Sequence, residues 1–366
     1  MSLLSAGIWA VEQGLVPDAV TRRAIRTLCR KRLDEATAGS GEQRAGRQRE
    51  LITSMRQGPI AVCTREANQQ HYELPSEFFA AVLGPRLKYS CAFWESEQTT
   101  LAEAEDVALA TTCERAGLTD GQDVLELGCG WGSLSLWMAQ HYPRSRITAV
   151  SNSVPQRRFI EGRVAAMGLN NLRVVTADIN DFQPDQGKPG GAATFDRVVS
   201  VEMFEHLRNY QELLARVASW LRPDGKAFVH IFCHRQSAYF FDTSGEANWM
   251  GRYFFTGGLM PSSDLLTAFD RDLKVTRQWQ WSGEHYRRTA EDWLANLDGN
   301  SDRIQQVLSE VYGQAEARRW LNRWRMFFLA VAELFGFAGG REWFVGHYLL
   351  EPVAQAVKGD AQLCRH

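Results

Sequence analysis

The sequence of 366 residues lacks any apolar run that approaches the ~20 residues of a membrane-spanning helix. Its first residues lack the basic stretch that precedes the apolar part of a signal peptide, so we expect none. The seven cysteines include no CxxC pair, and their odd number predicts free thiols in a reducing compartment. Together these features predict a cytoplasmic protein.

The sequence also lacks a large excess of either positive or negative charge. The chain has 41 Lys and Arg against 43 Asp and Glu, a formal net charge of −2, which offers no basic surface to a polyanion. We therefore expect no nucleic-acid partner. The histidines and cysteines do not show the spacing of metal ligands, so we expect no metal. The sequence allows a homodimer and leaves the oligomeric state open.

What the chain does have is enough hydrophobic residues, 45%, for a large core. We divide it into an N-terminal helical segment, residues 1–70, and a main domain, residues 71–366. Residues 19–33 have helical periodicity, with arginines opposite the apolar face. This helix either faces solvent or contacts an acidic or membrane surface. Residues 36–50, "ATAGSGEQRAGRQRE", are rich in Gly, Ser and charge and predict a flexible break.

Strands and helices alternate from about residue 121 onward. The expected strands are short apolar runs: "DVLELG" (123–128), "RITAVS" (146–151), "LRVVTAD" (172–178), "FDRVVSV" (195–201) and "KAFVHIF" (226–232). Such alternation predicts a parallel α/β sheet with right-handed crossovers. We place the core sheet within residues 115–235 and later strands near 273–281 and 342–351. A helical and aromatic cap, residues 236–335, should cover the cleft.

The stretch "VLELGCGWG", residues 124–132, is the sharpest local motif. A strand leads into Gly128, Gly130 and Gly132, and a helix follows, so the backbone can turn tightly and approach a ligand closely. The GxGxG spacing is neither the dinucleotide fingerprint nor a phosphate-binding loop with its lysine. The motif resembles the first motif of class I S-adenosylmethionine-dependent methyltransferases.

That resemblance implies positions for the cofactor, S-adenosyl-L-methionine, whose product is S-adenosyl-L-homocysteine. Glu126 stands where the family has an acidic residue that orients the glycine loop. Asp178 matches the position that accepts from the adenine amino group, and Ile179 flanks the base. The second strand ends in "AVSNS" instead of the family's ribose-binding carboxylate, and Asn152 and Gln156 can bind the diol in its place.

Several segments in order resemble a narrower group, the cyclopropane-fatty-acid synthases and coclaurine-type N-methyltransferases. They include "HYELPSEFFAAVLGPRLKYSCAFW", "LELGCGWGSLSL", "VEMFEHLRNY", "YFFTGGLMPS" and "SGEHYRRT". The resemblance implies a class I Rossmann-like methyltransferase with a seven-stranded, mostly parallel sheet and a helical cap. The N-methyltransferase branch methylates an amine beside a Glu–His pair. The synthase branch methylates a lipid double bond with bound bicarbonate as base.

Some residues of the sequence favour the N-methyltransferase branch, and others favour the synthase branch. The segments "HYELPSEFF", "VSNS" and "SGEHYRRT" look closer to the N-methyltransferases. Cys91, His230 and Tyr286, with Glu205, match the residue types that surround bicarbonate in the synthases. From the sequence alone, Cys91 is equally a small buried hydrophobe, and His230 in its apolar strand is also explained as a satisfied core histidine.

The stretch "VEMFEHLR", residues 201–208, follows the fourth strand, whose carboxyl end faces the ligand cleft of an open α/β sheet. Methyl transfer to an amine needs a base near the reacting nitrogen. We assign Glu205 as acceptor and charge stabiliser, His206 as the group that takes the proton, and Glu202 as a residue that orients the site or meets the cofactor. The alternative is an ion-paired helix start, which explains the acids but not the imidazole.

Other candidates come from loops and aromatic positions. Tyr89 and Ser90 match positions that touch the cofactor carboxylate in related enzymes. Tyr72, Trp324 and Phe327 form either an aromatic box for a cationic amine or ordinary core.

We predict transfer of a methyl group to a small cyclic or aromatic amine. Carbon methylation of an unsaturated lipid, with bicarbonate as an additional group, stays open. A cofactor-binding regulator without turnover is a third alternative, although a pure binder has no need of a base.

Overall fold

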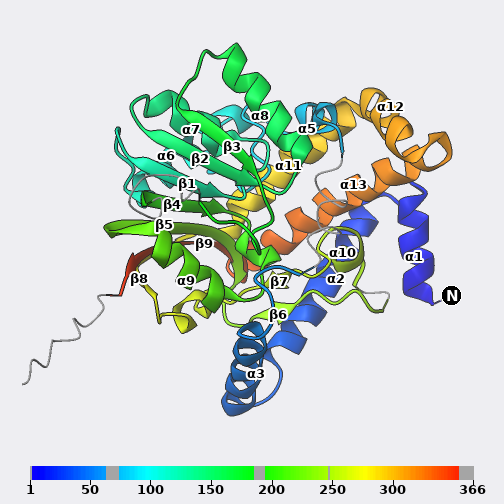
Figure 1. Ribbon diagram of the computed structural model, residues 1–366. Helices are drawn as coiled ribbons and strands as arrows, with labels where there is room; N and C mark the ends of the chain where they lie inside the picture. Colours follow the sequence, from blue (N-terminus) through cyan, green and yellow to red (C-terminus); the bar gives the residue numbers. More distant parts are fainter. Residues whose placement is uncertain (1, 63–73, 185–193, 246–247, 354–366) are drawn as a thin grey trace, which may run out of the picture.

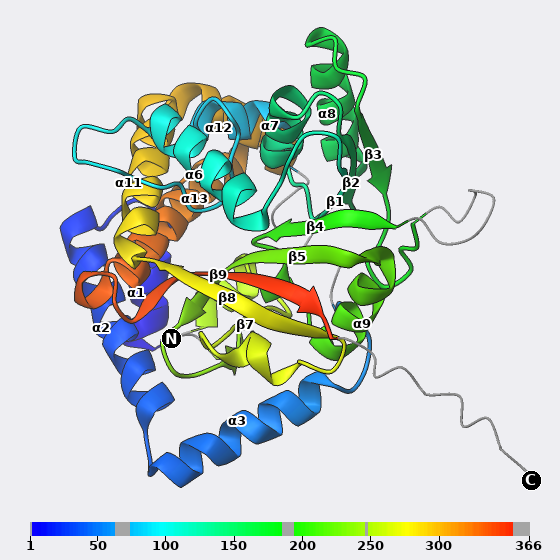
Figure 2. The same cartoon turned by 90° about the vertical axis from the view of Figure 1, so that its left-hand side faces the viewer.

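The computed structural model describes residues 2–62, 74–184, 194–245 and 248–353. At its centre lies a seven-stranded sheet with the order β3-β2-β1-β4-β5-β9-β8, which Figure 2 shows from the side. Its strands are β1 (Asp123–Leu127), β2 (Arg146–Ser151), β3 (Leu172–Thr176), β4 (Phe195–Val201), β5 (Leu221–His234), β8 (Leu273–Trp281) and β9 (Trp343–Pro352). Only the pairs that include β9 are antiparallel among these strands. The predicted, mostly parallel sheet is confirmed.

Helices cover both faces of the central strands, which explains why β1 is buried at all five of its positions, whereas most residues of the edge strand β8 are exposed or half-buried. The helices beside it are α6 (Leu101–Ala116), α7 (Ser133–His141), α8 (Val154–Ala166) and α9 (Tyr210–Trp220). Val124 of β1 belongs to a core cluster with Leu109 of α6 and Leu134 of α7. Its neighbour Leu125 points to the opposite face and belongs to a cluster with Leu213 of α9. Alternating side chains of one strand therefore bind two helical layers to the sheet.

A second group of helices, the cap, lies beyond the ends toward which the parallel strands point (Figure 1). It consists of α1 (Leu3–Glu12), α2 (Asp18–Thr37), α5 (Ser76–Val82), α10 (Trp249–Tyr253), α11 (Gly283–Gly299), α12 (Ser301–Tyr312) and α13 (Gln314–Phe335). Ion pairs join its N-terminal and C-terminal parts, since Glu12 pairs with Arg323 and Arg22 with Glu333. Within the described residues, no helix combines the length and the apolar character needed to cross a bilayer.

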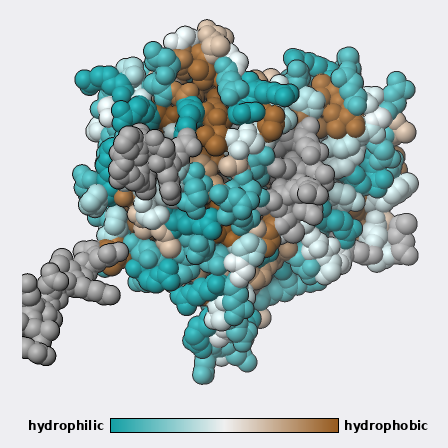
Figure 3. Space-filling view, in the orientation of Figure 1, coloured by the Kyte–Doolittle hydropathy of each residue, from teal (hydrophilic) through white to brown (hydrophobic). Residues whose placement is uncertain are grey.

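The flexible break predicted over residues 36–50 is wrong. Helix α3 (Gly41–Met55) occupies most of it. Ser40 caps the helix by accepting from the Gln43 backbone N–H, and the Gln43 side chain accepts from the Ser40 N–H at 2.8 Å. This capping box, followed by good helix formers such as Gln, Arg and Glu, outweighs the glycines. The helix forms an arm with a hydrophilic surface at the bottom of Figure 3.

Candidate active site

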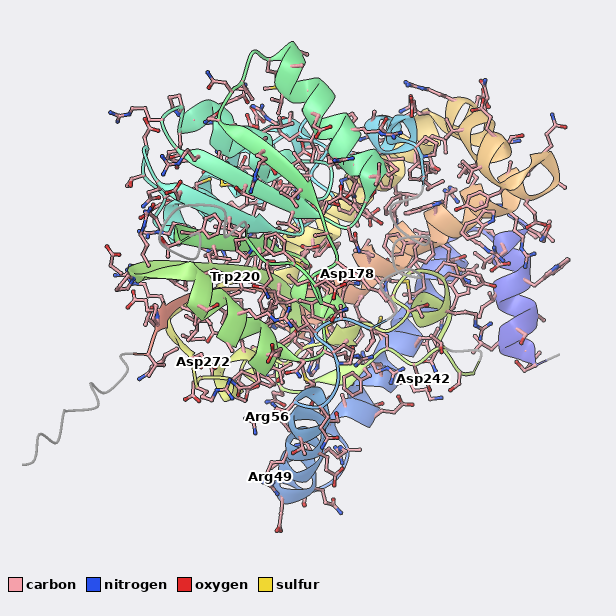
Figure 4. All side chains as sticks on the ribbon, viewed as in Figure 1. Arg49, Arg56, Asp178, Trp220, Asp242 and Asp272 are labelled. Atoms are coloured by element: carbon pink, nitrogen blue, oxygen red, sulfur yellow. The ribbon has the colours of Figure 1, made fainter. Side chains whose placement is uncertain are left out.

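The glycine loop after β1 forms one wall of a cavity at the carboxyl ends of β1, β2 and β3. Gly128 and Gly130 have φ values of +79° and +52°, a region that other residues rarely adopt. A Cβ on Gly130 would meet nothing within 4 Å, so this residue faces open space. The cavity is lined by the predicted cofactor residues Tyr89, Ser90, Glu126, Gly128, Gly130, Asn152, Gln156, Asp178 and Ile179. In Figure 4, Asp178 lies past the end of β3, on the side of the cap.

Gly132, predicted to bind the cofactor, does not line this cavity. It has a φ of +81° at the start of α7, and a Cβ there would lie 2.6 Å from Cγ1 of Ile160. The glycine is thus explained by the close approach of α8 to the loop. Its role is structural.

Buried polar atoms show that the cavity suits a polar ligand. The Nε2 of Gln156, Nε1 of Trp131 and Oγ of Ser133 are buried without a hydrogen-bond partner among the described residues. Burial raises the pKa of Glu126 to about 7, although the Ser135 hydroxyl donates to it. Unpaired donors of this kind are costly in an empty protein and are satisfied by a ligand. The donors and acceptors present fit S-adenosylmethionine.

Lys88 is a site residue that no sequence motif marked. Its ammonium is buried and donates to Oγ of Ser90 and to the Cys91 carbonyl, both at 2.6 Å. Burial lowers its pKa, and the nearby Glu202 acts in the opposite direction. A lone lysine in "LKYS" is usually a surface charge, so only the fold reveals that it lines the cofactor cavity.

Glu202 stands at the end of β4 with a strained φ of +46°. Its Oε1 accepts from the Cys91 backbone N–H at 2.9 Å and from Nε2 of His230 at 3.1 Å. Its Oε2 accepts from the Tyr286 hydroxyl at 2.6 Å. Burial raises its pKa, while Lys88, the Cys91 N–H and the Tyr286 hydroxyl oppose the shift. These donors hold the carboxylate in one orientation.

Cys91 and His230 do not line either cavity of the site. Cys91 contributes its backbone N–H to Glu202 and its carbonyl to Lys88, while its thiol donates to the Ala92 carbonyl. His230 lies behind Glu202 in β5 and is fully buried. Tyr286, by contrast, lines the cavity next to the cap and also contacts Glu202.

Glu205 and His206 follow in a short 3-10 helix, η1 (Phe204–His206). Glu205 is buried, and its Oε2 has no partner among the described residues. Burial, followed by the charge of Glu202, raises the pKa of Glu205 well above its usual range. Burial lowers the pKa of His206 to about 4, and its ring stacks on Phe255 at 5.6 Å. At neutral pH the imidazole is therefore neutral.

A second cavity of about 270 Å³ lies between η1 and the cap. Its walls are largely aromatic and include Phe232, Phe241, Phe255, Phe327, Tyr286 and Trp293. Ile25 and Leu28 of α2 close one side. Glu202, His206 and Tyr89 line both cavities, so the two meet at these residues.

Of the predicted aromatic box, Phe327 lines the second cavity but Trp324 does not. Trp324 is fully buried and packs on Phe78, with ring centroids 4.8 Å apart, and on Phe254 at 5.0 Å. It belongs to the core of the cap and also contacts Phe327, with ring centroids 5.6 Å apart. Tyr72 lies outside the described residues. In the part of the chain that is described, no cluster of His, Cys, Asp or Glu is arranged to hold a metal ion.

Residues 62–336 match the protein family described as mycolic acid cyclopropane synthetase. The chain belongs to this family. Within the family it is 39% identical to an (S)-coclaurine N-methyltransferase of Thalictrum flavum subsp. glaucum over 346 residues, covering 93% of this chain and 94% of that protein. It is 30% identical to the cyclopropane-fatty-acyl-phospholipid synthase of Escherichia coli over 227 residues, 62% of this chain and 54% of that protein.

A crystal structure of coclaurine N-methyltransferase bound to N-methylheliamine and SAH has the same architecture. It matches with a TM-score of 0.90 and 36% sequence identity, covering 96% of this chain and 100% of that one. The class I methyltransferase fold implied by the sequence is thereby confirmed. So is the prediction that this member of the family is an S-adenosylmethionine-dependent methyltransferase.

Proposed function

We propose that the protein transfers a methyl group from S-adenosylmethionine to the nitrogen of a small cyclic amine joined to an aromatic ring. One observation carries this proposal: Tyr89, Glu202 and His206 line both the glycine-loop cavity and the aromatic cavity. A donor and an acceptor in these cavities meet beside Glu202 and His206, next to the Glu205 carboxylate of η1. S-adenosylmethionine supplies a methyl group on a positively charged sulfur, which is a good leaving group.

The residues of the chain orient the amine and remove its proton. The nitrogen lone pair forms the new bond to the methyl carbon, and the electrons of the broken carbon–sulfur bond stay on sulfur. We assign the amine proton to Glu205, whose carboxylate lines the aromatic cavity and whose Oε2 has no partner among the described residues. His206 is a poor final holder because burial lowers its pKa to about 4. The neutral imidazole instead accepts a hydrogen bond from the amine and aligns it.

The aromatic cavity supports an amine of this class. A positive charge on the nitrogen is stabilised over aromatic rings by on the order of 1–2 kcal/mol when water is excluded. A volume of about 270 Å³ suits a small ring system. Relatives with nearly full coverage include two coclaurine N-methyltransferases and a pavine N-methyltransferase, whose names state N-methylation, whereas the match to the synthase covers little more than half of that protein.

Bicarbonate is not required in this proposal. Of the four residues predicted to surround it, all but Glu205 donate to the Glu202 carboxylate instead: the backbone N–H of Cys91, the His230 ring and the Tyr286 hydroxyl. We infer that this side chain fills the place of the external anion. The lipid reaction, which would depend on that anion, is accordingly the second candidate.

The proposal is tested by offering tetrahydroisoquinoline amines and unsaturated phospholipids with methyl-labelled cofactor. We expect label in the amines only. Glu205→Gln should lower turnover by ~10²–10⁴ with S-adenosylhomocysteine binding retained, while the exposed Glu114→Gln leaves both unchanged. Label in lipid alone, or full turnover by Glu205→Gln, contradicts the proposal.

A further inference from the structure

A line of buried hydrogen bonds runs from the active-site carboxylate across the sheet to α6. His230 of β5 and His347 of β9 are direct partners in the antiparallel register. Nε2 of His230 lies 3.1 Å from Oε1 of Glu202, and Nε2 of His347 lies 2.9 Å from Nδ1 of His230. Nη1 of Arg115 completes the line at 2.8 Å from Nδ1 of His347. Both imidazoles are fully buried.

The arginine at the end of this line determines which ring nitrogen of each histidine carries the proton. A guanidinium has only donors, so Nδ1 of His347 accepts and the His347 proton is on Nε2. That proton is donated to Nδ1 of His230, which places the His230 proton on Nε2 as well. His230 therefore always presents an N–H to Glu202. Each ring can donate in only one direction as long as Arg115 stays in place.

Other contacts keep the line in place and its two histidines uncharged. The guanidinium of Arg115 lies over the rings of Trp279 and Trp281, at 5.3 and 5.6 Å from their centroids. Trp281 also packs on His347 at 4.2 Å. Burial lowers the pKa of both histidines, and the positive charges of Arg115 and Lys88 act in the same direction. A neutral ring carries a single N–H, so neither histidine can donate to both neighbours.

The line cannot carry the substrate's proton away, because the arginine at its far end has no lone pair to accept one. Its effect is on orientation. Glu202 is held by the donor from His230, and the charge of Glu202 in turn raises the pKa of Glu205. A change at α6 is thus transmitted to the group that receives the amine proton.

We propose that Arg115 and His347 are positioning residues for methyl transfer, which fix the tautomer of His230 so that its Nε2–H always faces Glu202. Neither residue lines a cavity of the site. The kinetic part of this inference rests on the proposed function. The tautomers are a property of the folded protein and can be measured without turnover.

The first test is nuclear magnetic resonance of the full-length protein labelled with nitrogen-15 in histidine, with the two rings assigned by single replacements. For both His230 and His347 we expect a protonated Nε2 and an unprotonated Nδ1 at neutral pH. A doubly protonated ring, or a proton on Nδ1 of either ring, overturns the inference. This readout is unaffected if the amine substrate has been misidentified.

The second test compares two variants of one position. His347→Leu interrupts the line, whereas in His347→Gln the amide oxygen accepts from Arg115 and the amide N–H donates to His230. We expect kcat to fall about tenfold in His347→Leu and to stay within about twofold in His347→Gln, with the KM for the amine and S-adenosylhomocysteine binding nearly unchanged in both. Arg115→Met should lower kcat as His347→Leu does. Equal kcat values in the Leu and Gln variants overturn the inference.

Discussion

Glu202 is the residue that, in our proposal, takes the place of an external anion. Its φ of +46° belongs to the region that glycine prefers, yet the position holds a glutamate whose carboxylate receives three donors. Backbone strain at such a position costs on the order of 1–3 kcal/mol and persists only where the surroundings compensate. The hydrogen bonds to Cys91, His230 and Tyr286 provide that compensation.

Replacing this side chain should create a dependence on added anions. Glu202→Gly relieves the strained φ and leaves the three donors around an empty space. We expect turnover to fall by ~10²–10⁴ and to recover in part when bicarbonate or formate is added. The wild-type protein should be insensitive to both anions in buffer freed of carbon dioxide.

Glu202→Gln is the matched control, because its amide fills the space and should block recovery. Loss of wild-type turnover on removal of bicarbonate would show that the external ion is needed after all.

Among the elements, α6 holds the loop that carries Lys88, Tyr89 and Ser90. Glu105 of α6 is fully buried and accepts from the backbone N–H groups of Arg86 and Lys88, at 2.8 and 3.3 Å. Burial raises its pKa from 4.5 to about 7. The folded protein therefore keeps the Glu105 proton at pH values where the unfolded chain has lost it.

This raised pKa makes stability depend on pH. For an acid whose folded pKa is raised, the free energy of unfolding falls as pH rises from the unfolded to the folded value, here from 4.5 to about 7. The loss amounts to about 3 kcal/mol over that interval. In urea unfolding at several pH values, Glu105→Gln should reduce the change of the free energy of unfolding with pH. Glu114→Gln, at an exposed position of the same helix, should leave that change as it is in the wild type. Identical slopes for Glu105→Gln and wild type would contradict the assignment.

Helix α1 is joined to α13 and to the wall of the aromatic cavity through one buried carboxylate. Glu12 accepts from Arg323 and from Nε1 of Trp249, both at 3.1 Å, and from Arg319 at 2.7 Å. Trp249 lines the cavity. The N-terminal helices thus take part in shaping the site, while the division at residue 70 stays a prediction.

Removing that carboxylate leaves the Arg323 charge buried and unpaired. We expect Glu12→Ala to lower the free energy of unfolding by about 3–5 kcal/mol and to raise the KM for the amine. Glu316→Ala, which breaks the exposed pair with Arg319, should cost less than about 1 kcal/mol. Urea unfolding of both variants checks this, and equal losses would refute it.

For the molecule as a whole, the cofactor should act as a stabilising ligand, because its cavity is formed only when the ends of the strands and the loops around residues 61 and 88 come together in the folded protein. S-adenosylhomocysteine at 100 times its Kd should add about 2.7 kcal/mol to the free energy of unfolding. Gly130→Leu, which fills open space in the cavity, should abolish the increase in melting temperature. Gly162→Ala in α8, where a Cβ meets nothing within 4 Å, should keep it. A shift that survives Gly130→Leu would place the ligand elsewhere.

The sequence by itself determined the sheet and the cofactor loop, because both depend on local patterns. Apolar runs of strand length, separated by amphipathic helices, require a covered parallel sheet, and GxGxG after the first strand requires a close backbone turn. Glu202, Glu205 and His206 could be predicted as site residues because they directly follow a strand that the local pattern identifies. The break predicted at residues 36–50 was wrong because the Gly and Ser content there was given more weight than the capping box of Ser40 and Gln43.

Only the tertiary structure decided which side chains share an environment. Cys91, His230 and Tyr286 lie far apart in the sequence, and their convergence on Glu202 follows from the pairing of β4 with β5 and the packing of α11. Burial raises the pKa of Glu205 and lowers that of His206. The burial of a side chain is set by the fold and cannot be read from the residue type. Which of Trp324 and Phe327 lines the aromatic cavity likewise depends on the elements packed around α13, since helical spacing alone fits core and cavity equally well.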